Sequence, residues 1–266
     1  MTRLRSVSGR LWSSFRRTGK ILFGFATLLC FLTHHWFSFN KKGAPSRSFG
    51  TCAIVLNSGL LSDPRYEYGE FIDRHDTVVR FNMAPTKGYE KIVGTRTTYM
   101  WTWHAHYPTF QSKMDNAEYQ NTTVMIGPYP WDAKLLRESG IPAHRFEIPN
   151  ATEIAQVCKS EWLREDFAAH FPHKRCSSGV NAVIYFRPRC REVNVFGLYY
   201  GDLCDIPYRY FSTRKCNSTD VKKIDPSHNF TYEHELFQIY SARDGKLNIH
   251  PDPREAFTVV NENFHR

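Results

Sequence analysis

The first fifty residues contain no aspartate or glutamate, although they hold nine of the 35 lysines and arginines in this chain of 266 residues. The other residues carry 26 basic and 26 acidic side chains, so the formal net charge of +9 lies entirely in the amino-terminal part. A protein that binds nucleic acid is expected to present a basic face on its folded region. The distribution of charge therefore argues against nucleic acid as a partner.

Other features are missing as well. The sequence has no Cys-x-x-Cys pair, which argues against a zinc cluster, and it shows no internal repeat and no low-complexity tract. Hydrophobic residues make up 41% of the chain and aromatic residues 15%. This composition is sufficient for a packed core, and the length predicts one domain with additional segments.

Charged residues are also absent from residues 21–40, which include many large apolar side chains. About 20 residues in a helix span the apolar part of a bilayer, and the six basic residues that precede this segment are typical of the cytoplasmic side. A cleaved signal peptide is the alternative, but the segment has no A-x-A cleavage pattern and follows a long charged region. We therefore predict a cytoplasmic tail (1–20), a transmembrane signal anchor (21–40), a short polar stem (41–50) and a luminal domain (51–266).

The cysteines and glycosylation sequons agree with a luminal location. Cys30 lies in the predicted anchor, and an even number of cysteines remains for disulfide bonds: Cys52, Cys158, Cys176, Cys190, Cys204 and Cys216. Six cysteines allow 15 connectivities, so sequence alone leaves the pairing open. Sequons of the type N-x-S/T begin at Asn121, Asn150, Asn217 and Asn229.

The luminal part alternates between strand-like and helix-like segments. Apolar or β-branched runs predict strands at Thr51–Leu56, Thr77–Phe81, Thr97–Trp103, Thr122–Ile126 and Val193–Phe196. Helices are expected at Ala133–Ser139, Ile154–His170, Ser178–Phe186 and Tyr232–Ala242. Such alternation predicts an α/β fold with a mostly parallel sheet and helices on both faces.

Two loops of small residues stand out because ligands of α/β sheets bind at the carboxyl ends of strands. Asn57-Ser58-Gly59 follows the first predicted strand, and Ser177-Ser178-Gly179 opens a predicted helix. Small residues let a ligand approach the backbone, and a helix amino terminus attracts phosphate. Taken separately, each loop is better explained as an ordinary turn or an ordinary helix cap.

The same residues carry a resemblance to a known family. Residues 52–98 contain C-A-x-V-x-N-S-G, then E-x-I-D, then R-x-N-x-A-P-T-x-G-Y-E-x-x-V-G-x-R-T, and this pattern resembles the large sialylmotif of eukaryotic sialyltransferases. Residues 176–197 (CSSGVNAVIYFRPRCREVNVFG) resemble the small sialylmotif. The third motif is matched by 207–212 (PYRYFS) and the very small motif, H-x₄-E, by 228–233 (HNFTYE). The sequence after His228 is most similar to the branch that acts on GalNAc or sialylated glycans at O6.

The resemblance implies a Rossmann-like variant of the GT-A fold in a single-pass type II protein of the Golgi membrane. It implies a disulfide bond between Cys52 and Cys190; Cys204–Cys216 and Cys158–Cys176 are the further pairings we consider. The partners it implies are a CMP-sugar donor and a glycan acceptor, with CMP-sialic acid as the donor substrate. Residues expected to contact the CMP donor are Asn57, Ser58, Asn82, Ser177, Ser178, Gly179, Gly197, Tyr208 and Arg209.

His228 matches the family's proposed general base. A histidine titrates near neutral pH, which suits the removal of a proton from an acceptor hydroxyl as that hydroxyl attacks the anomeric carbon. Glu233 is expected to be structural or to orient the histidine. The sequence contains no Asp-x-Asp, which is typical of this family; no cofactor and no metal are therefore expected, and direct displacement would invert the anomeric configuration.

Some residues depart from the family pattern. Arg209 takes the place where the third motif usually has a histidine, and Ser212 takes the place of an acidic residue. Arginine pairs with phosphate but is a poor proton donor at neutral pH. Two alternatives follow: a transferase that uses CMP-Kdo or another CMP-ulosonic acid, and a degenerate homologue that binds glycans without catalysis. A glycan at Asn229 would crowd His228, so this sequon is expected to be unmodified.

Overall fold

The computed structural model describes residues 48–127, 130–150, 154, 176–198, 206–212, 228 and 230–251. By its contacts the chain divides into two units, Met1–Ser46 and Arg47–Arg266, and all described residues belong to the second. Within the described part, no helix is both long enough and apolar enough to cross a membrane. The predicted anchor at 21–40, Cys158, Cys204 and Cys216 lie outside it, as does the predicted helix Ile154–His170 apart from Ile154.

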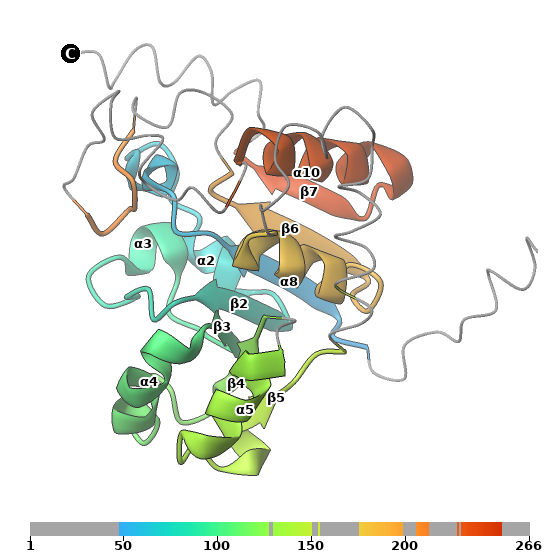
Figure 1. Ribbon diagram of the computed structural model, residues 1–266. Coiled ribbons are helices and arrows are strands. Elements are labelled where there is room, and N and C mark those ends of the chain that lie inside the picture. Colours follow the sequence, from blue (N-terminus) through green and yellow to red (C-terminus); the bar gives the residue numbers. More distant parts are fainter. Residues whose placement is uncertain are drawn as a thin grey trace, which may run out of the picture. The chain divides into compact units, whose positions relative to one another are not determined.

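A seven-stranded sheet forms the centre of the second unit, and every paired strand is parallel to its neighbour. The spatial order is β5-β4-β3-β2-β1-β6-β7 (Figure 1). The strands are β1 (Thr51–Val55), β2 (Thr77–Phe81), β3 (Tyr99–Thr102), β4 (Thr123–Ile126), β5 (Phe146–Glu147), β6 (Glu192–Phe196) and β7 (Leu247–His250). The predicted α/β class and parallel sheet are confirmed, and β5 and β7 were not predicted.

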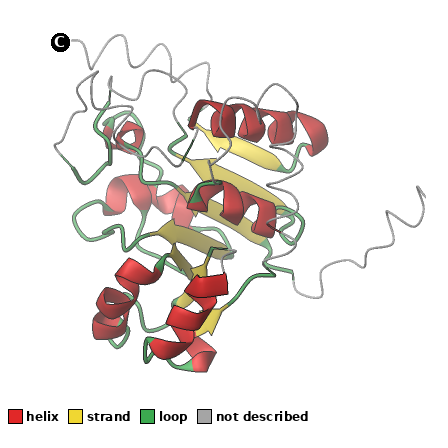
Figure 2. Cartoon of the chain, viewed as in Figure 1, coloured by secondary structure: helices red, strands yellow, loops and turns green. Residues whose placement is uncertain are grey.

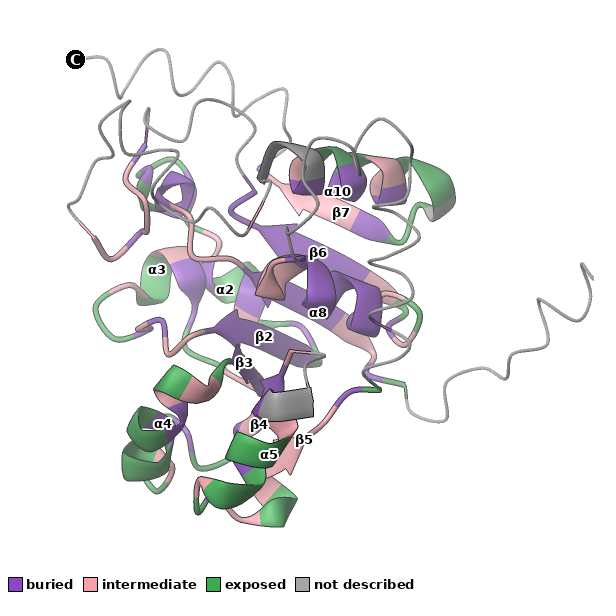
Figure 3. Ribbon diagram, in the orientation of Figure 1, coloured by how far each residue is buried: buried purple, intermediate pink, exposed green. Residues whose placement is uncertain are grey.

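Both faces of the central strands are buried, as continuous apolar strands require. Alternate residues point to opposite faces, so Ile54 and Val79 pack with α8 (Ser178–Phe186), whereas Ala53 and Val78 pack on the other side with α2 (Gly69–Asp73) and α3 (Glu90–Val93). Figure 2 shows the sheet in yellow with α8 in front of it, and Figure 3 shows α8 and the central strands mostly in the colour of buried residues.

Further helices cover the two ends of the sheet. α10 (Phe230–Asp244) packs on β7, and α4 (Tyr107–Lys113) and α5 (Pro130–Glu138) lie by β3 and β4. Three 3₁₀ turns complete the described elements: η1 (Gly59–Ser62), η2 (His104–His106) and η3 (Ala143–Arg145). The prediction for α8 has the correct bounds, whereas α5 and α10 begin earlier than predicted because Pro130 and Phe230 already lie in their first turns.

The order of the strands creates a switch point at the middle of the sheet. From β1 the chain proceeds through β2 to β5 on one side and then returns to place β6 on the other side of β1. In open parallel sheets, ligands bind beyond the carboxyl ends of the strands at such a point. Leu56–Gly59 follow β1 and include the first loop singled out from the sequence, and Gly197 follows β6. The second loop, Ser177–Gly179, opens α8.

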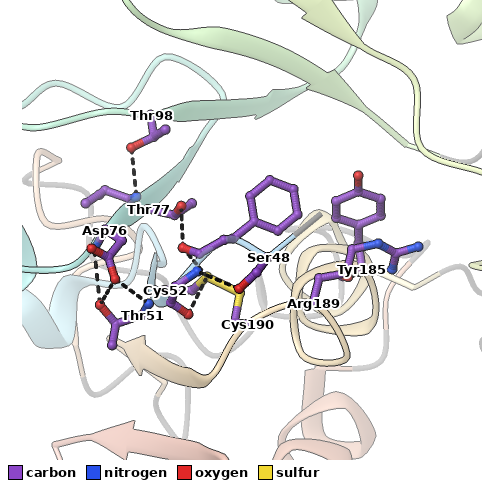
Figure 4. The surroundings of a disulfide bond; sticks show 12 residues. Ser48, Thr51, Cys52, Asp76, Thr77, Thr98, Tyr185, Arg189 and Cys190 are labelled. Atoms are coloured by element: carbon purple, nitrogen blue, oxygen red, sulfur yellow. Dashed lines mark hydrogen bonds between the residues drawn. A yellow bond between two sulfur atoms is a disulfide. The ribbon is translucent and has the colours of Figure 1, made fainter. Parts of the chain in front are cut away.

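A disulfide bond links the start of β1 to the turn before β6 (Figure 4). It joins Cys52 to Cys190, 138 residues apart, and confirms the predicted pair. Thr51 anchors the same region, because its N–H and hydroxyl both donate to Asp76 Oδ2, at 2.7 and 2.9 Å. These two bonds lower the pKa of Asp76. Cys176 is disulfide-bonded as well, and its proposed partner Cys158 lies outside the described residues.

Candidate functional site

The loop after β1 and the amino terminus of α8 lie against each other. A Cβ atom placed on Gly179 would be 3.0 Å from Leu56 Cδ2, which is tighter than an ordinary contact. A larger residue at position 179 would require the Leu56 side chain to shift. The large-motif and small-motif segments therefore lie in close contact at Gly179.

The segment 206–212, which contains the third motif, packs on the same loop. A Cβ on Gly59 would overlap the carbonyl oxygen of Pro207, so only glycine permits this approach. Tyr210 N donates to Asn57 O at 3.1 Å, and Tyr210 Oη donates to Pro85 O at 2.7 Å. These contacts fix Tyr208 and Arg209 above the end of β1. The Arg209 guanidinium lies over the rings of Tyr208 and Phe211, at 5.3 and 5.6 Å from their centroids.

Two asparagines stand side by side where β1 and β2 end. Asn57 Nδ2 donates to Phe81 O at 3.3 Å, and Asn82 Oδ1 accepts from Thr102 Oγ1 at 3.3 Å. Asn57 Oδ1 is buried and accepts no hydrogen bond from the described residues. Asn82 and Met83 both have positive φ angles, 53° and 58°. Consecutive non-glycine residues in this region are strained, and such strain is commonly found at functional sites.

Ser58, Ser177 and Gly197 have clear local roles. Ser58 Oγ accepts from Leu60 N at 3.2 Å, so Ser58 caps η1. Ser177 Oγ accepts from Val180 N at 3.4 Å and caps α8 in the same way. Gly197 has a φ of +82° directly after β6. Structural capping therefore accounts for the two serine side chains, and ligand binding is an additional expectation.

Glu233 connects the very small motif to the small motif. Its carboxylate is 3% exposed and accepts a hydrogen bond of 2.7 Å from Ser177 N. His228 Nδ1 lies 3.8 Å from the same carboxylate oxygen, and the His228 side chain is 20% exposed. A negative charge at the amino terminus of α8 is stabilised by the helix dipole. Glu233 thus places His228 beside the helix terminus at which the small motif begins.

The amino terminus of α8 keeps two backbone donors for a ligand. The N–H groups of Ser178 and Gly179 occupy the first helical turn and have no acceptor among the described residues. Together with the helix dipole, such donors form an anion site. The arrangement can therefore hold a phosphate close to a partly exposed imidazole. In the described part of the chain, no group of three or more His, Cys, Asp or Glu side chains is arranged to hold a metal ion.

A cavity of about 620 Å³ opens elsewhere in the unit. Its wall carries both signs of charge, and none of the residues predicted to bind the donor contributes to it; Asp76, Thr86, Lys87, Glu90, Arg96 and Glu118 do. We therefore place the candidate site where the four motif segments meet and not at this cavity. Asn121, a sequon residue in the cavity wall, is exposed, as is Asn150, while Asn217 and Asn229 lie outside the described residues.

Sequence reasoning missed the residues that follow β3. Trp103 is 48% exposed, and His104 and His106 in η2 contact its ring, with centroid distances of 4.9 and 6.1 Å. His104 Nδ1 bonds to the buried carboxylate of Asp132 at 2.9 Å. Burial and the charge of Arg209 lower the pKa of His106. Trp103 was predicted as the last residue of the strand Thr97–Trp103, whereas β3 ends at Thr102. The signal that would have found these residues is their position at the end of that predicted parallel strand.

Comparisons with known proteins agree with this geometry. The model of glycosyltransferase family 29 (sialyltransferase) matches residues 30–242. The chain is 49% identical over 186 residues to a chicken (Gallus gallus) beta-galactoside alpha-2,6-sialyltransferase 2, which covers 62% of this chain and 35% of that protein. It is 31% identical over 163 residues to a chicken CMP-N-acetylneuraminate-beta-galactosamide-alpha-2,3-sialyltransferase 1, which covers 55% of this chain and 43% of the relative. The matches therefore span less than half the length of these relatives.

Solved structures show a similar fold. A mammalian sialyltransferase superposes with a TM-score of 0.53 at 23% identity, covering 79% of this chain and 71% of that one. A Campylobacter jejuni sialyltransferase solved with cytidine-5'-monophosphate gives a TM-score of 0.50 at 13% identity, with coverages of 77% and 81%. At these identities the likeness establishes the fold alone.

Proposed function

Because the chain belongs to glycosyltransferase family 29, the sialyltransferases, we propose that it transfers sialic acid from CMP-sialic acid to a hydroxyl group of a glycoprotein or glycolipid glycan. One observation supports this most strongly: the four motif segments, distant in sequence, make direct contacts around the carboxyl end of β1. Gly179 contacts Leu56, Tyr210 bonds to Asn57, and Glu233 joins Ser177 to His228.

In the proposed reaction, His228 removes the proton from the acceptor hydroxyl as the oxygen attacks the anomeric carbon of the donor. The bond from that carbon to the CMP phosphate breaks, and its electron pair leaves with CMP. The carboxylate of Glu233, 3.8 Å from Nδ1, stabilises the imidazolium that forms. One displacement inverts the anomeric configuration, and the proposal includes no metal ion.

The leaving phosphate requires positive groups at fixed positions. The N–H groups of Ser178 and Gly179 at the start of α8 supply two donors. Arg209, held between Tyr208 and Phe211, supplies a positive charge that replaces the histidine usual in the third motif. Asn57 Oδ1, which lacks a hydrogen bond within the described residues, accepts from the exocyclic amine or a ribose hydroxyl of the nucleotide in this proposal.

The finer assignments also belong to the proposal. The parallel sheet is interpreted as the Rossmann-like GT-A variant, and residues 21–40 as the membrane anchor of a type II Golgi protein whose catalytic domain, 51–266, is luminal. The related enzymes named above act on β-galactosides or β-galactosamides according to their names. The acceptor branch at GalNAc O6 stays a prediction from sequence.

The test is release of CMP from CMP-sialic acid by the purified full-length chain in detergent, with and without a panel of glycan acceptors. We expect release that depends on the acceptor and is lost in His228→Ala, with unchanged thermal unfolding. A folded His228→Ala variant with full turnover would refute the assigned base. CMP binding without transfer to any acceptor would favour the non-catalytic alternative.

The presence of Arg209 in the third motif supports one specific alternative, in which the donor is CMP-Kdo or another CMP-ulosonic acid. The departure at this position changes a group that the family resemblance assigns to the donor phosphate, so CMP-Kdo belongs in the same assay. A higher kcat/KM with CMP-Kdo than with CMP-sialic acid would assign the enzyme to that donor.

A further inference from the structure

The residues directly after β3 form an exposed surface beside the candidate site. Trp103, His104 and His106, which we call the Trp103 platform, occupy the carboxyl edge of β3, next to β2 in the sheet. Trp103 is one of the few large hydrophobic side chains that are well exposed in the described part of the chain, at 48%. An exposed indole is costly to hydrate, and such residues commonly mark binding sites.

A hydrogen bond, the strand register and an electrostatic effect connect the platform to the candidate site. Thr102, which precedes Trp103, donates through Oγ1 to Asn82 Oδ1 at 3.3 Å. The parallel register pairs Phe81 with Trp101, so the next residues of the two chains, Asn82 and Thr102, lie side by side at the carboxyl edge of the sheet. The charge of Arg209 acts on His106. The platform therefore lies on the same edge of the sheet as Asn57 and Asn82, on the side away from β6.

A buried acid fixes the orientation of His104. Asp132 of α5 is 6% exposed at its side chain and bonds to His104 Nδ1 at 2.9 Å. The imidazole side chain is 41% exposed, and its Nε2 has no partner among the described residues. A carboxylate on Nδ1 leaves Nε2 as the nitrogen that meets a ligand. The pair presents one oriented hydrogen-bonding atom beside the indole.

We infer that the Trp103 platform binds a pyranose ring of the acceptor glycan, a proposal that rests on the proposed transferase function. The C–H face of the sugar stacks on the electron-rich indole of Trp103, and His104 Nε2 bonds to one sugar hydroxyl. The cytosine base is a less suitable occupant, because the switch point between β1 and β6 lies two strands away from β3.

The same geometry gives His106 a supporting role. Its ring packs against the indole of Trp103, with a centroid distance of 6.1 Å. Burial and the charge of Arg209 lower the pKa of His106.

Kinetics of the full-length chain with Trp103→Ala test the inference. We expect the KM for the acceptor to rise about tenfold or more, with the KM for CMP-sialic acid within about twofold of wild type. Trp103→Phe retains an aromatic face and should recover most of the acceptor affinity. Leu135→Ala is the matched control, since Leu135 is 38% exposed on α5 and has no place in the platform; its kinetics should equal those of wild type.

Binding is measured separately, so that a failure of the proposed function can be recognised. Saturation-transfer NMR of the wild-type chain with CMP and either methyl β-galactoside or methyl α-N-acetylgalactosaminide should show sugar signals that disappear in Trp103→Ala. Sugar binding without transfer would reject the transferase activity and retain the platform. An unchanged acceptor KM and NMR signal in Trp103→Ala, or a loss confined to CMP, would overturn the platform.

Discussion

Glu233 combines two interactions in a single buried carboxylate. It accepts the N–H of Ser177 at 2.7 Å and lies 3.8 Å from His228 Nδ1, and only 3% of its side chain is exposed. The first interaction, with a backbone N–H, supports the fold, and the second, with the proposed base, supports catalysis. Different substitutions of Glu233 can therefore remove the second interaction with or without the first.

Glu233→Gln should separate them. The amide oxygen of glutamine can still accept the Ser177 N–H, so we expect thermal unfolding close to that of wild type. The negative charge next to His228 is lost, however, and kcat should fall about tenfold, as each 1.4 kcal/mol of transition-state stabilisation corresponds to a factor of ten. Glu233→Ala, the matched comparison, leaves a buried donor unsatisfied and should also lose about 1–3 kcal/mol of folding free energy. Full activity of Glu233→Gln would show that the carboxylate is only structural.

At the scale of elements, α10 determines where the very small motif lies. Its first turn holds Glu233, and Leu236, Phe237 and Tyr240 bury one side of the helix in the core that also contains α8. The helix therefore connects the proposed catalytic residues to the main core. Any change that loosens α10 should disturb the contact between Glu233 and Ser177 as well.

Acid should loosen α10 through His234. Burial lowers the pKa of His234 to about 4, below the ordinary value of 6.5. Between these two pH values His234 is protonated in the unfolded chain but not in the folded chain. The free energy of unfolding is therefore unaffected by His234 above pH 6.5 and decreases as the pH falls toward 4, by about 1–2 kcal/mol at pH 5. We expect Tm to fall less between pH 7 and pH 5 in His234→Gln than in wild type or in His144→Gln, which changes an exposed histidine. Equal decreases in all three would contradict the prediction.

Local patterns predicted single elements well and contacts between them poorly. Residues 77–81 and 178–186 follow strand and helix periodicities closely enough that the bounds of β2 and α8 were correct. β7 escaped prediction because its four residues, Leu247–His250, alternate apolar and polar side chains over too short a run. The two-residue β5 offers no pattern at all.

At the scale of the whole molecule, the site depends on neighbours that are far apart in sequence. Ser177 and Glu233 are 56 residues apart, and Tyr210 bonds to Pro85 across 125 residues. Periodicity carries no information on such pairs, so the capping role of Glu233 and the position of the 206–212 segment had to come from the structure. The Cys52–Cys190 bond was anticipated only through the family resemblance, because six cysteines leave the connectivity open.

That disulfide bond should stabilise the fold more than it shapes the donor site. Opening a loop of 138 residues in Cys52→Ser/Cys190→Ser should lower the free energy of unfolding by about 4–5 kcal/mol in the entropic model. The ladder between β1 and β6 pairs every residue from Thr51 to Val55, and Leu56 N continues it by bonding to Phe196 O at 3.0 Å. Chemical denaturation should therefore show a large loss of stability, while the folded variant binds CMP with a Kd within about threefold of wild type. Cys30→Ser, in the predicted anchor, is the control for loss of a thiol. If CMP binding disappeared from a variant that is still folded, the disulfide bond rather than the β1–β6 ladder would be what holds the switch point together.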